Sequence, residues 1–234
     1  MDSTYILVLA GALLCLIASG YLRSTYNKYS RIRSMSGLTG AQTAERILKR
    51  SGLDSVKVER VSGHLTDHYD PRKKAVRLSE AVYDSASVAA VGVAAHECGH
   101  AIQHGHGYAF LKIRSALAPV AMIGSRLGLP LVFLGMIFGL EFPLPGVDYL
   151  FSLIDLGIIV FGLAVLFQII TLPVEFNASS RALSTLGDYG ILGDSEVKGS
   201  RRVLTAAALT YVASAATAVL QLLRLIVLRD SRRR

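Results

Sequence analysis

The sequence has few of the residues that mark a soluble domain. It contains no tryptophan, only two cysteines, and charged residues at just 18% of its 234 positions, whereas soluble domains carry about 25%. Cys15 and Cys98 are too few and too far apart for a disulfide framework or a cysteine-built zinc site. With 52% hydrophobic residues and a mean hydropathy of +0.45, the chain is not disordered, and an ordinary soluble fold is not expected.

Acidic residues are scarce as well. Lysine and arginine number 25 against 17 aspartate and glutamate residues, which gives a net charge of +8. A basic chain can bind nucleic acid, but these basic residues flank apolar runs and form no patch with interleaved aromatic residues. Basic flanks are typical of membrane segments. The expected partner is therefore the lipid bilayer and not nucleic acid, and no pattern indicates an oligomeric state.

Three apolar runs predict helices that cross the membrane. Residues 5–22 form the first, and the basic residues that follow it at once predict that its N-terminus lies outside. Residues 116–140 and 150–172 predict a transmembrane helical hairpin, because the loop 141–149 between them contains acidic but no basic residues. Together these flanks predict that residues 23–115 lie on the cytoplasmic side.

Two features of the apolar runs are less regular. Pro119 and Pro130 are expected to break the first arm of the hairpin, so that its membrane-crossing part begins near Leu127. Residues 203–228 form a fourth apolar run, followed by an arginine-rich tail. If this run crossed the membrane, the tail would emerge outside, against the charge rule. We expect it to be at least partly buried against protein, with Arg224 paired or reaching the interface, and whether it spans stays open.

Residues 34–110 form the longest polar stretch and predict a compact α+β unit. Apolar spacing predicts one helix over residues 40–52 and another that begins after Ser85 or Ser87 and extends past Ile102. Between them, residues 56–61 and 75–78 predict the two strands of a short β-hairpin.

The motif His96-Glu97-Cys98-Gly99-His100 lies within the second predicted helix. Histidines four residues apart lie on one helix face, where both imidazoles can bind one tetrahedral zinc ion. Glu97 lies beside them as a candidate general base, which takes a proton from an activated water and passes it to a leaving amine. Cys98 is expected to be a packing residue. The pattern predicts one catalytic Zn²⁺ ion.

A catalytic zinc needs a third protein ligand, and two residues compete for this role. His106 has the spacing of the extended metzincin motif, but Gln103 replaces the glycine that turns the chain there. Glu175 follows the third apolar run. Two predicted spans separate it from His100, so both residues lie on the same side of the membrane. This parity supports Glu175 without excluding His106.

Further segments complete a recognisable pattern: 65–71 (LTDHYDP), 78–80 (LSE), 94–104 (AAHECGHAIQH) and 172–179 (LPVEFNAS). With them, nearly the whole chain resembles the YugP-type membrane zinc metallopeptidases of bacteria. The resemblance implies a zinc-dependent endopeptidase in the cell membrane, with ligands at His96, His100 and Glu175 and a general base at Glu97. The segment after the third run is also similar to membrane peptidases of the HtpX kind, which often carry an acidic residue where this chain has Asn177.

The expected fold is an α-rich α+β integral membrane protein. It combines a zincin-like catalytic unit, built from a short β-hairpin and the His-Glu-x-x-His helix, with three to four hydrophobic helices. The expected segments are an N-terminal transmembrane helix (1–22), the catalytic unit (23–115), a transmembrane hairpin (116–172), a third-ligand segment (173–202), and a C-terminal hydrophobic helix with a basic tail (203–234).

The expected function is hydrolysis of peptide bonds in membrane or membrane-proximal proteins. We hypothesise that the strand at 75–78 is a sheet edge that binds an extended substrate by strand addition, although it can equally be an ordinary packed hairpin strand. Tyr211, Arg181 and His68 are candidates for stabilising the oxyanion. The alternative function is a catalytically silent membrane scaffold or adaptor with a structural zinc.

Overall fold

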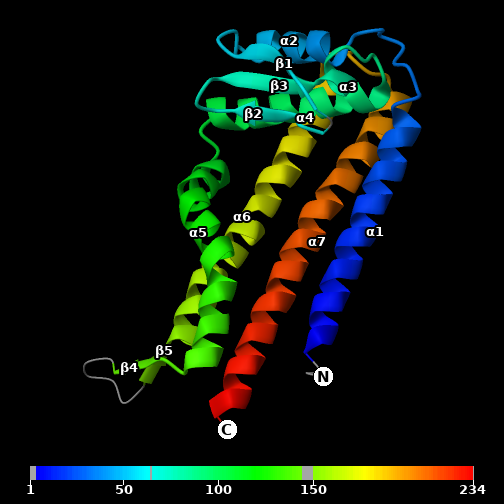
Figure 1. The fold of residues 1–234 in the computed structure, drawn as a ribbon. Helices are drawn as coiled ribbons and strands as arrows, with labels where there is room; N and C mark the ends of the chain where they lie inside the picture. Colours follow the sequence, from blue (N-terminus) through cyan, green and yellow to red (C-terminus); the bar gives the residue numbers. More distant parts are fainter. Residues whose placement is uncertain (1–3, 64, 144–149, 234) are drawn as a thin grey trace. The chain divides into compact units, whose positions relative to one another are not determined.

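The computed structural model describes residues 4–63, 65–143 and 150–233, so part of the predicted acidic loop, including Asp148, lies outside the described residues. The described helices are α1 (Tyr5–Tyr29), α2 (Gly40–Arg50), α3 (Glu80–Tyr83), α4 (Val88–Gly105), α5 (Ala109–Phe138), α6 (Leu153–Asp188) and α7 (Asp194–Arg233) (Figure 1). The described strands are β1 (Lys57–Val61), β2 (His68–Asp70), β3 (Ala75–Ser79), β4 (Glu141–Pro143) and β5 (Leu150–Ser152). This α-rich architecture with a short β-hairpin confirms the expected fold class.

The chain forms two compact units. The apolar unit comprises the described residues of Met1–Ile17, Ile113–Leu172 and Tyr211–Arg234, and the α+β unit comprises Ala18–Lys112 and Pro173–Thr210. Helices α1, α5, α6 and α7 therefore contribute residues to both units. The predicted five-segment division by function stays a prediction.

Helices α1, α5, α6 and α7 are each long and apolar enough to cross a membrane. Pro119 and Pro130 lie inside α5, so the predicted break at these prolines is wrong, while the start of the membrane-crossing part near Leu127 stays a prediction. A proline costs a backbone hydrogen bond, but a break would leave further polar backbone groups without partners in an apolar environment. Continuing the helix avoids this larger cost.

Helix α7 packs against α5 and α6 within the apolar unit. Leu225 belongs to a buried cluster with Val132 of α5 and Phe161 of α6. Arg224 is paired, as the sequence suggested: its Nε donates to Thr4 Oγ1 at 3.3 Å, and its guanidinium lies 4.3 Å from the centre of the Tyr5 ring.

Glycines allow close contact between α5 and α6. A Cβ added at Gly124 would lie 2.3 Å from the carbonyl oxygen of Val160, and one at Gly128 would lie 2.7 Å from Cβ of Phe161. Small residues at such contacts are typical of helices that pack in membranes, where close backbone approach replaces the hydrophobic driving force.

The sheet of the α+β unit has the strand order β1-β3-β2 (Figure 1). β1 pairs with β3 in parallel, and β2 pairs with β3 in the antiparallel direction. The predicted hairpin exists, but its strands are β2 and β3. The predicted hairpin pairing of residues 56–61 with 75–78 is wrong, because β2 is a three-residue polar strand whose sequence, His68-Tyr69-Asp70, lacks an alternating apolar pattern.

The central position of β3 also overturns one hypothesis about substrate binding. Both sides of β3 are hydrogen-bonded to neighbouring strands, so it cannot accept a further strand. The edges of this sheet are β1 and β2.

The core of the α+β unit joins its sheet to several helices, α2, α4 and α6 among them. Ile47 of α2, Leu78 of β3, Val91 of α4 and Leu186 of α6 belong to one buried cluster. Helix α4 begins at the predicted position, because the Ser87 hydroxyl accepts a hydrogen bond from the backbone N–H of Ala90 at 3.2 Å. Since α4 and the C-terminal part of α6 share this core, their polar residues can be held at fixed positions.

Substituting Gly124→Val tests the contact between α5 and α6. We expect destabilisation by about 1–3 kcal/mol, because the new side chain meets backbone that cannot move aside cheaply. Gly162→Val is the matched control, since a Cβ at Gly162 of α6 meets nothing within 4 Å. Thermal unfolding in detergent measures both variants, and an equal loss in the two would contradict the close contact.

Candidate metal centre

Helix α4 places the two motif histidines next to each other. The ring centres of His96 and His100 lie 4.8 Å apart, with the ring planes at 85°. This arrangement follows from the helix, in which residues i and i+4 share a face.

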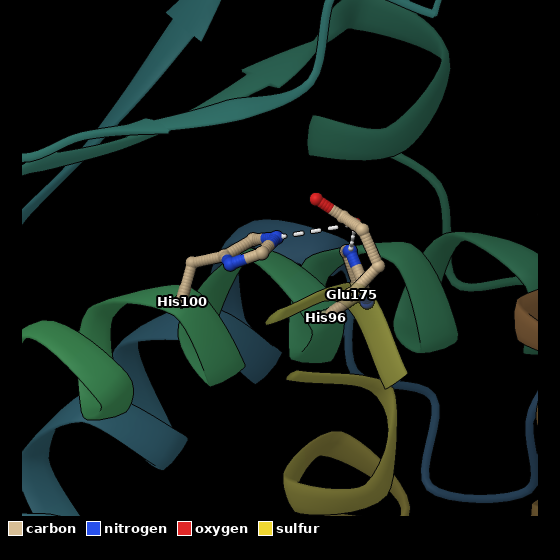
Figure 2. A group of neighbouring side chains, drawn as sticks. All are labelled: His96, His100 and Glu175. Atoms are coloured by element: carbon tan, nitrogen blue, oxygen red, sulfur yellow. Dashed lines mark ion pairs between the residues drawn. The ribbon is translucent and has the colours of Figure 1, made fainter. Parts of the chain in front are cut away.

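Glu175 of α6 completes a group of three side chains. Its Oε2 atom lies 3.3 Å from Nε2 of His96 and 3.5 Å from Nε2 of His100, and the three ligand atoms lie within 4.8 Å of one another. Figure 2 shows both rings and the carboxylate directed toward one point. The structure therefore brings together His96, His100 and Glu175.

His106 does not belong to this group. It follows the last residue of α4, and its Nδ1 lies 3.4 Å from a terminal nitrogen of Arg181. Of the two candidates for the third ligand, the geometry favours Glu175.

Gly99 allows α4 and α6 to approach closely enough for the three side chains to meet. A Cβ at Gly99 would lie 2.4 Å from the carbonyl oxygen of Ala178. Ala178 is fully buried, so the backbone of α6 lies directly against that of α4 at this point. The glycine within the motif thus has a packing role that the motif alone does not reveal.

Hydrogen bonds hold the outer nitrogen of each imidazole. Nδ1 of His96 lies 3.2 Å from the Ser179 hydroxyl, and Nδ1 of His100 lies 3.1 Å from Oε1 of Gln103. When each Nδ1 carries the proton and donates it in these bonds, each Nε2 keeps a free lone pair directed toward Glu175. The surroundings therefore favour the tautomers that bind a metal through Nε2.

Gln103 connects His100 to α6. It is fully buried, and its Nε2 donates to the carbonyl oxygen of Val174 at 2.8 Å and to Oδ1 of Asn177 at 3.0 Å. In the sequence, Gln103 stands out only as a departure from the metzincin pattern. The available signal was a long polar side chain in a largely apolar helix, which is costly to bury without partners.

Asn177 acts through other residues. Its Oδ1 accepts hydrogen bonds from Gln103 and from Nε of Arg181, the latter at 2.8 Å. Asn177 thus supports His100 through Gln103.

Glu97 is 8% exposed. Burial raises the pKa of its carboxyl group, although the neighbouring His96 and His100 oppose this effect. The adjacent Cys98 is fully buried, burial raises the pKa of its thiol, and its Sγ donates to the Ala44 carbonyl oxygen at 3.6 Å. Glu97 is thus a buried acid–base group, whereas Cys98 is an inert packing residue.

The donor set suits zinc. Two imidazole nitrogens and one carboxylate oxygen are the ligands of many catalytic zinc sites, which keep the fourth position open for water or substrate. Among the described residues, no fourth His, Cys, Asp or Glu joins the group. The residues present therefore fit a catalytic zinc site better than a structural one.

The three candidates for oxyanion stabilisation lie in different surroundings. Arg181 is bound to Asn177, while Nδ1 of His68 on β2 lies 2.8 Å from the Thr66 carbonyl oxygen. Tyr211 belongs to the apolar unit and not to the α+β unit that contains the centre. No geometry selects one of them, so this role stays a prediction.

Comparisons with known proteins agree with this chemistry. The model of a family described as "Putative neutral zinc metallopeptidase" matches residues 4–230. A curated relative, "Putative membrane protease YugP" of Bacillus subtilis (strain 168), is 48% identical over 208 residues, which cover 88% of each chain. No solved structure matches the chain.

Substituting Gly99→Ala tests whether close helix contact builds the centre. We expect a loss of about 1–3 kcal/mol of stability and weaker zinc binding, because the methyl group pushes Ala178, and with it Glu175, away from α4. Gly105→Ala in the same helix is the control, since its Cβ meets the end of the flexible Leu53 side chain. Thermal unfolding and metal analysis provide the readouts. Unchanged zinc affinity in Gly99→Ala would contradict this explanation.

Proposed function

The chain belongs to the family of neutral zinc metallopeptidases, and on this premise we propose that it is a membrane-embedded, zinc-dependent endopeptidase that cleaves membrane or membrane-proximal proteins. The observation that supports this most is the convergence of His96, His100 and Glu175, with the buried Glu97 next to His96 in the chain. Among the described residues, four helices are long and apolar enough to cross a membrane. Together with a relative named as a membrane protease, they support the membrane setting.

His96, His100 and Glu175 would hold one zinc ion. When bound, the ion supplies Lewis-acid chemistry, in which it lowers the pKa of water and polarises the peptide carbonyl. Ser179 and Gln103 keep the two imidazoles in the required orientation through their Nδ1 atoms. Glu175 brings the negative charge that balances part of the charge of the ion.

Glu97 is the proposed general base. Its carboxylate takes a proton from the water that attacks the peptide carbonyl, and then gives this proton to the amine as the C–N bond breaks. The products are a carboxylic acid and an amine. Because Glu97 has given up the proton that it accepted, its own carboxylate is regenerated. Burial raises the pKa of Glu97, which makes its carboxylate a stronger base for the first of these proton transfers.

The proposed substrate-binding edge is β2, in place of the excluded β3. β2 is an edge strand of the sheet, and the hydroxyl of Tyr69 in this strand bonds Nδ1 of His104 on α4 at 2.9 Å. This bond ties the edge to the helix that carries His96 and His100. An extended peptide added to β2 would therefore run beside the metal-binding helix.

The proposed location is the bacterial cell membrane, with several spans and the α+β unit on the cytoplasmic side. The basic residues that follow the first apolar run and the acidic residues of the loop 141–149 support this orientation. The arginine-rich C-terminal tail opposes it if α7 spans the membrane, so orientation needs a direct test.

Substituting Glu97→Gln tests the catalytic role. We expect cleavage of an unfolded protein substrate to fall by about 10²–10⁴-fold, while the purified protein keeps one zinc ion, because the amide cannot accept the proton and Glu97 is no ligand. His96→Ala and Glu175→Ala should lose the metal as well as activity. Glu80→Gln is the control, since this side chain is 59% exposed and forms a surface ion pair.

Two results would contradict the peptidase. Full activity in Glu97→Gln would exclude Glu97 as the base. The second result is a wild-type protein that holds zinc tightly but shows no zinc-dependent cleavage, meaning no cleavage of unfolded protein that chelation removes and added zinc restores. This result would favour the scaffold with a structural zinc.

Cysteine labelling tests the orientation. Lys73 is exposed in the turn between β2 and β3, and Glu141 is exposed in β4. We expect a membrane-impermeant maleimide to label Glu141→Cys but not Lys73→Cys in intact cells, and both after lysis. The parent chain measures the background from Cys15 and Cys98. The reverse pattern would place the α+β unit outside.

A further inference from the structure

The α+β unit contains a polar cleft whose lining includes none of the three residues of the candidate metal centre. This cleft of about 480 Å³ is lined by the ends of α2 and α4 and by the last turns of α6, and the residues that matter are Arg50, His106, Ser180, Arg181, Ser184 and Tyr189. The volume lies in the range of small-molecule sites, which is roughly 300–1,000 Å³. None of the residues that line the cleft is acidic, so two permanent positive charges face it.

Arg50 is held in place by neutral groups. A terminal nitrogen of Arg50 donates to the Tyr189 carbonyl oxygen at 3.0 Å, and the guanidinium lies 4.4 Å from the centre of the Tyr189 ring. Stacking on an aromatic ring orients the guanidinium plane and leaves most of its five N–H donors available.

Arg181 of α6 also lines the cleft and is held by hydrogen bonds. Its Nε donates to Oδ1 of Asn177 at 2.8 Å, and a terminal nitrogen lies 3.4 Å from Nδ1 of His106. Among the described residues, neither Arg50 nor Arg181 forms an ion pair with a carboxylate. Two oriented guanidinium groups thus share one cleft without a counter-charge from the described residues.

We propose that this cleft binds a phosphate group, either as free phosphate or as the headgroup of an anionic lipid. A carboxylate has two oxygens in one plane, which a single arginine fork satisfies. A phosphate carries about −1.5 to −2 charges and three strong acceptor oxygens. It can therefore accept hydrogen bonds from more than one of the donors that line the cleft, which are Arg50, Arg181 and the exposed hydroxyls of Ser180 and Ser184.

The structural alternative is that Arg50 serves only to bind the Tyr189 carbonyl and the end of α2, where a cation is favourable. That role explains one hydrogen bond of Arg50. It does not explain why a second guanidinium, fixed by Asn177, lines the same cleft without an acidic partner.

Calorimetric titration of the zinc-loaded, full-length protein in detergent with inorganic phosphate, at constant ionic strength, tests the proposal. We expect Arg50→Gln to weaken binding by about tenfold or more. Arg46→Gln should change it little, because Arg46 lies one turn earlier on α2 and does not line the cleft. Arg50 is the diagnostic residue, since Arg181 also contacts Asn177 beside the metal centre.

A second variant tests the same cleft in case Arg50→Gln does not fold. Ser184 is exposed on α6, and Ser184→Glu places a negative charge in the cleft, so it should abolish phosphate binding without disturbing the core. Zinc content and thermal unfolding confirm that each variant is folded.

The lipid source is tested in a separate arm. Nanodiscs of phosphatidylcholine are compared with nanodiscs of equimolar phosphatidylcholine and phosphatidylglycerol, and the unfolding temperature is measured. If phosphatidylglycerol stabilises the wild type and Arg46→Gln but not Arg50→Gln, the ligand of the cleft is a lipid headgroup. If inorganic phosphate binds but phosphatidylglycerol does not stabilise the protein, the ligand of the cleft is a soluble phosphate compound.

Three outcomes would overturn the proposal. The first is the absence of both phosphate binding and lipid stabilisation in the wild type. The second is an equal effect of Arg46→Gln and Arg50→Gln, which would show general charge attraction. The third is equal binding of acetate, which would show that the site does not select phosphate.

Discussion

The backbone contact between Gly99 and Ala178 is the constraint on which the metal centre depends. A Cβ at Gly99 would lie 2.4 Å from the Ala178 carbonyl oxygen, so α4 and α6 meet there without intervening side chains. This contact brings the Glu175 carboxylate to within 3.5 Å of both His96 and His100. A larger residue at position 99 would separate Glu175 from the two imidazoles.

Burial explains why the polar residues around this contact occur as a connected set. Glu175 is 2% exposed and Gln103 is fully buried, and polar groups in such surroundings are costly unless they have partners. Gln103 satisfies its own amide on Val174 and Asn177 while it orients His100. The same hydrogen bonds that make burial tolerable therefore hold the ligand in position.

Much of the fold could be predicted because its signals are local. The spacing of apolar residues and the Ser87 cap predicted α4, and the long apolar runs predicted the membrane helices. Pairing of strands is not local. Residues 56–61 and 75–78 both had strand patterns, but the chain between them forms the short polar strand β2, and the two strands pair in parallel instead of antiparallel. The predicted break at Pro119 and Pro130 was wrong for a related reason, since the environment of a helix decides whether a proline ends it.

The sequence by itself determined the motif chemistry: two imidazoles on one helix face and an adjacent glutamate follow from helical spacing alone. It also limited the third ligand to His106 or Glu175, and the membrane-crossing parity and the family resemblance both favoured Glu175. Only the tertiary structure placed Glu175 beside the two imidazoles, gave Gln103, Asn177 and Ser179 their supporting contacts, and brought Arg50 and Arg181 to one cleft. These residues come from different helices, up to 131 positions apart (181 − 50). Their meeting depends on how buried faces pack, which no local pattern records.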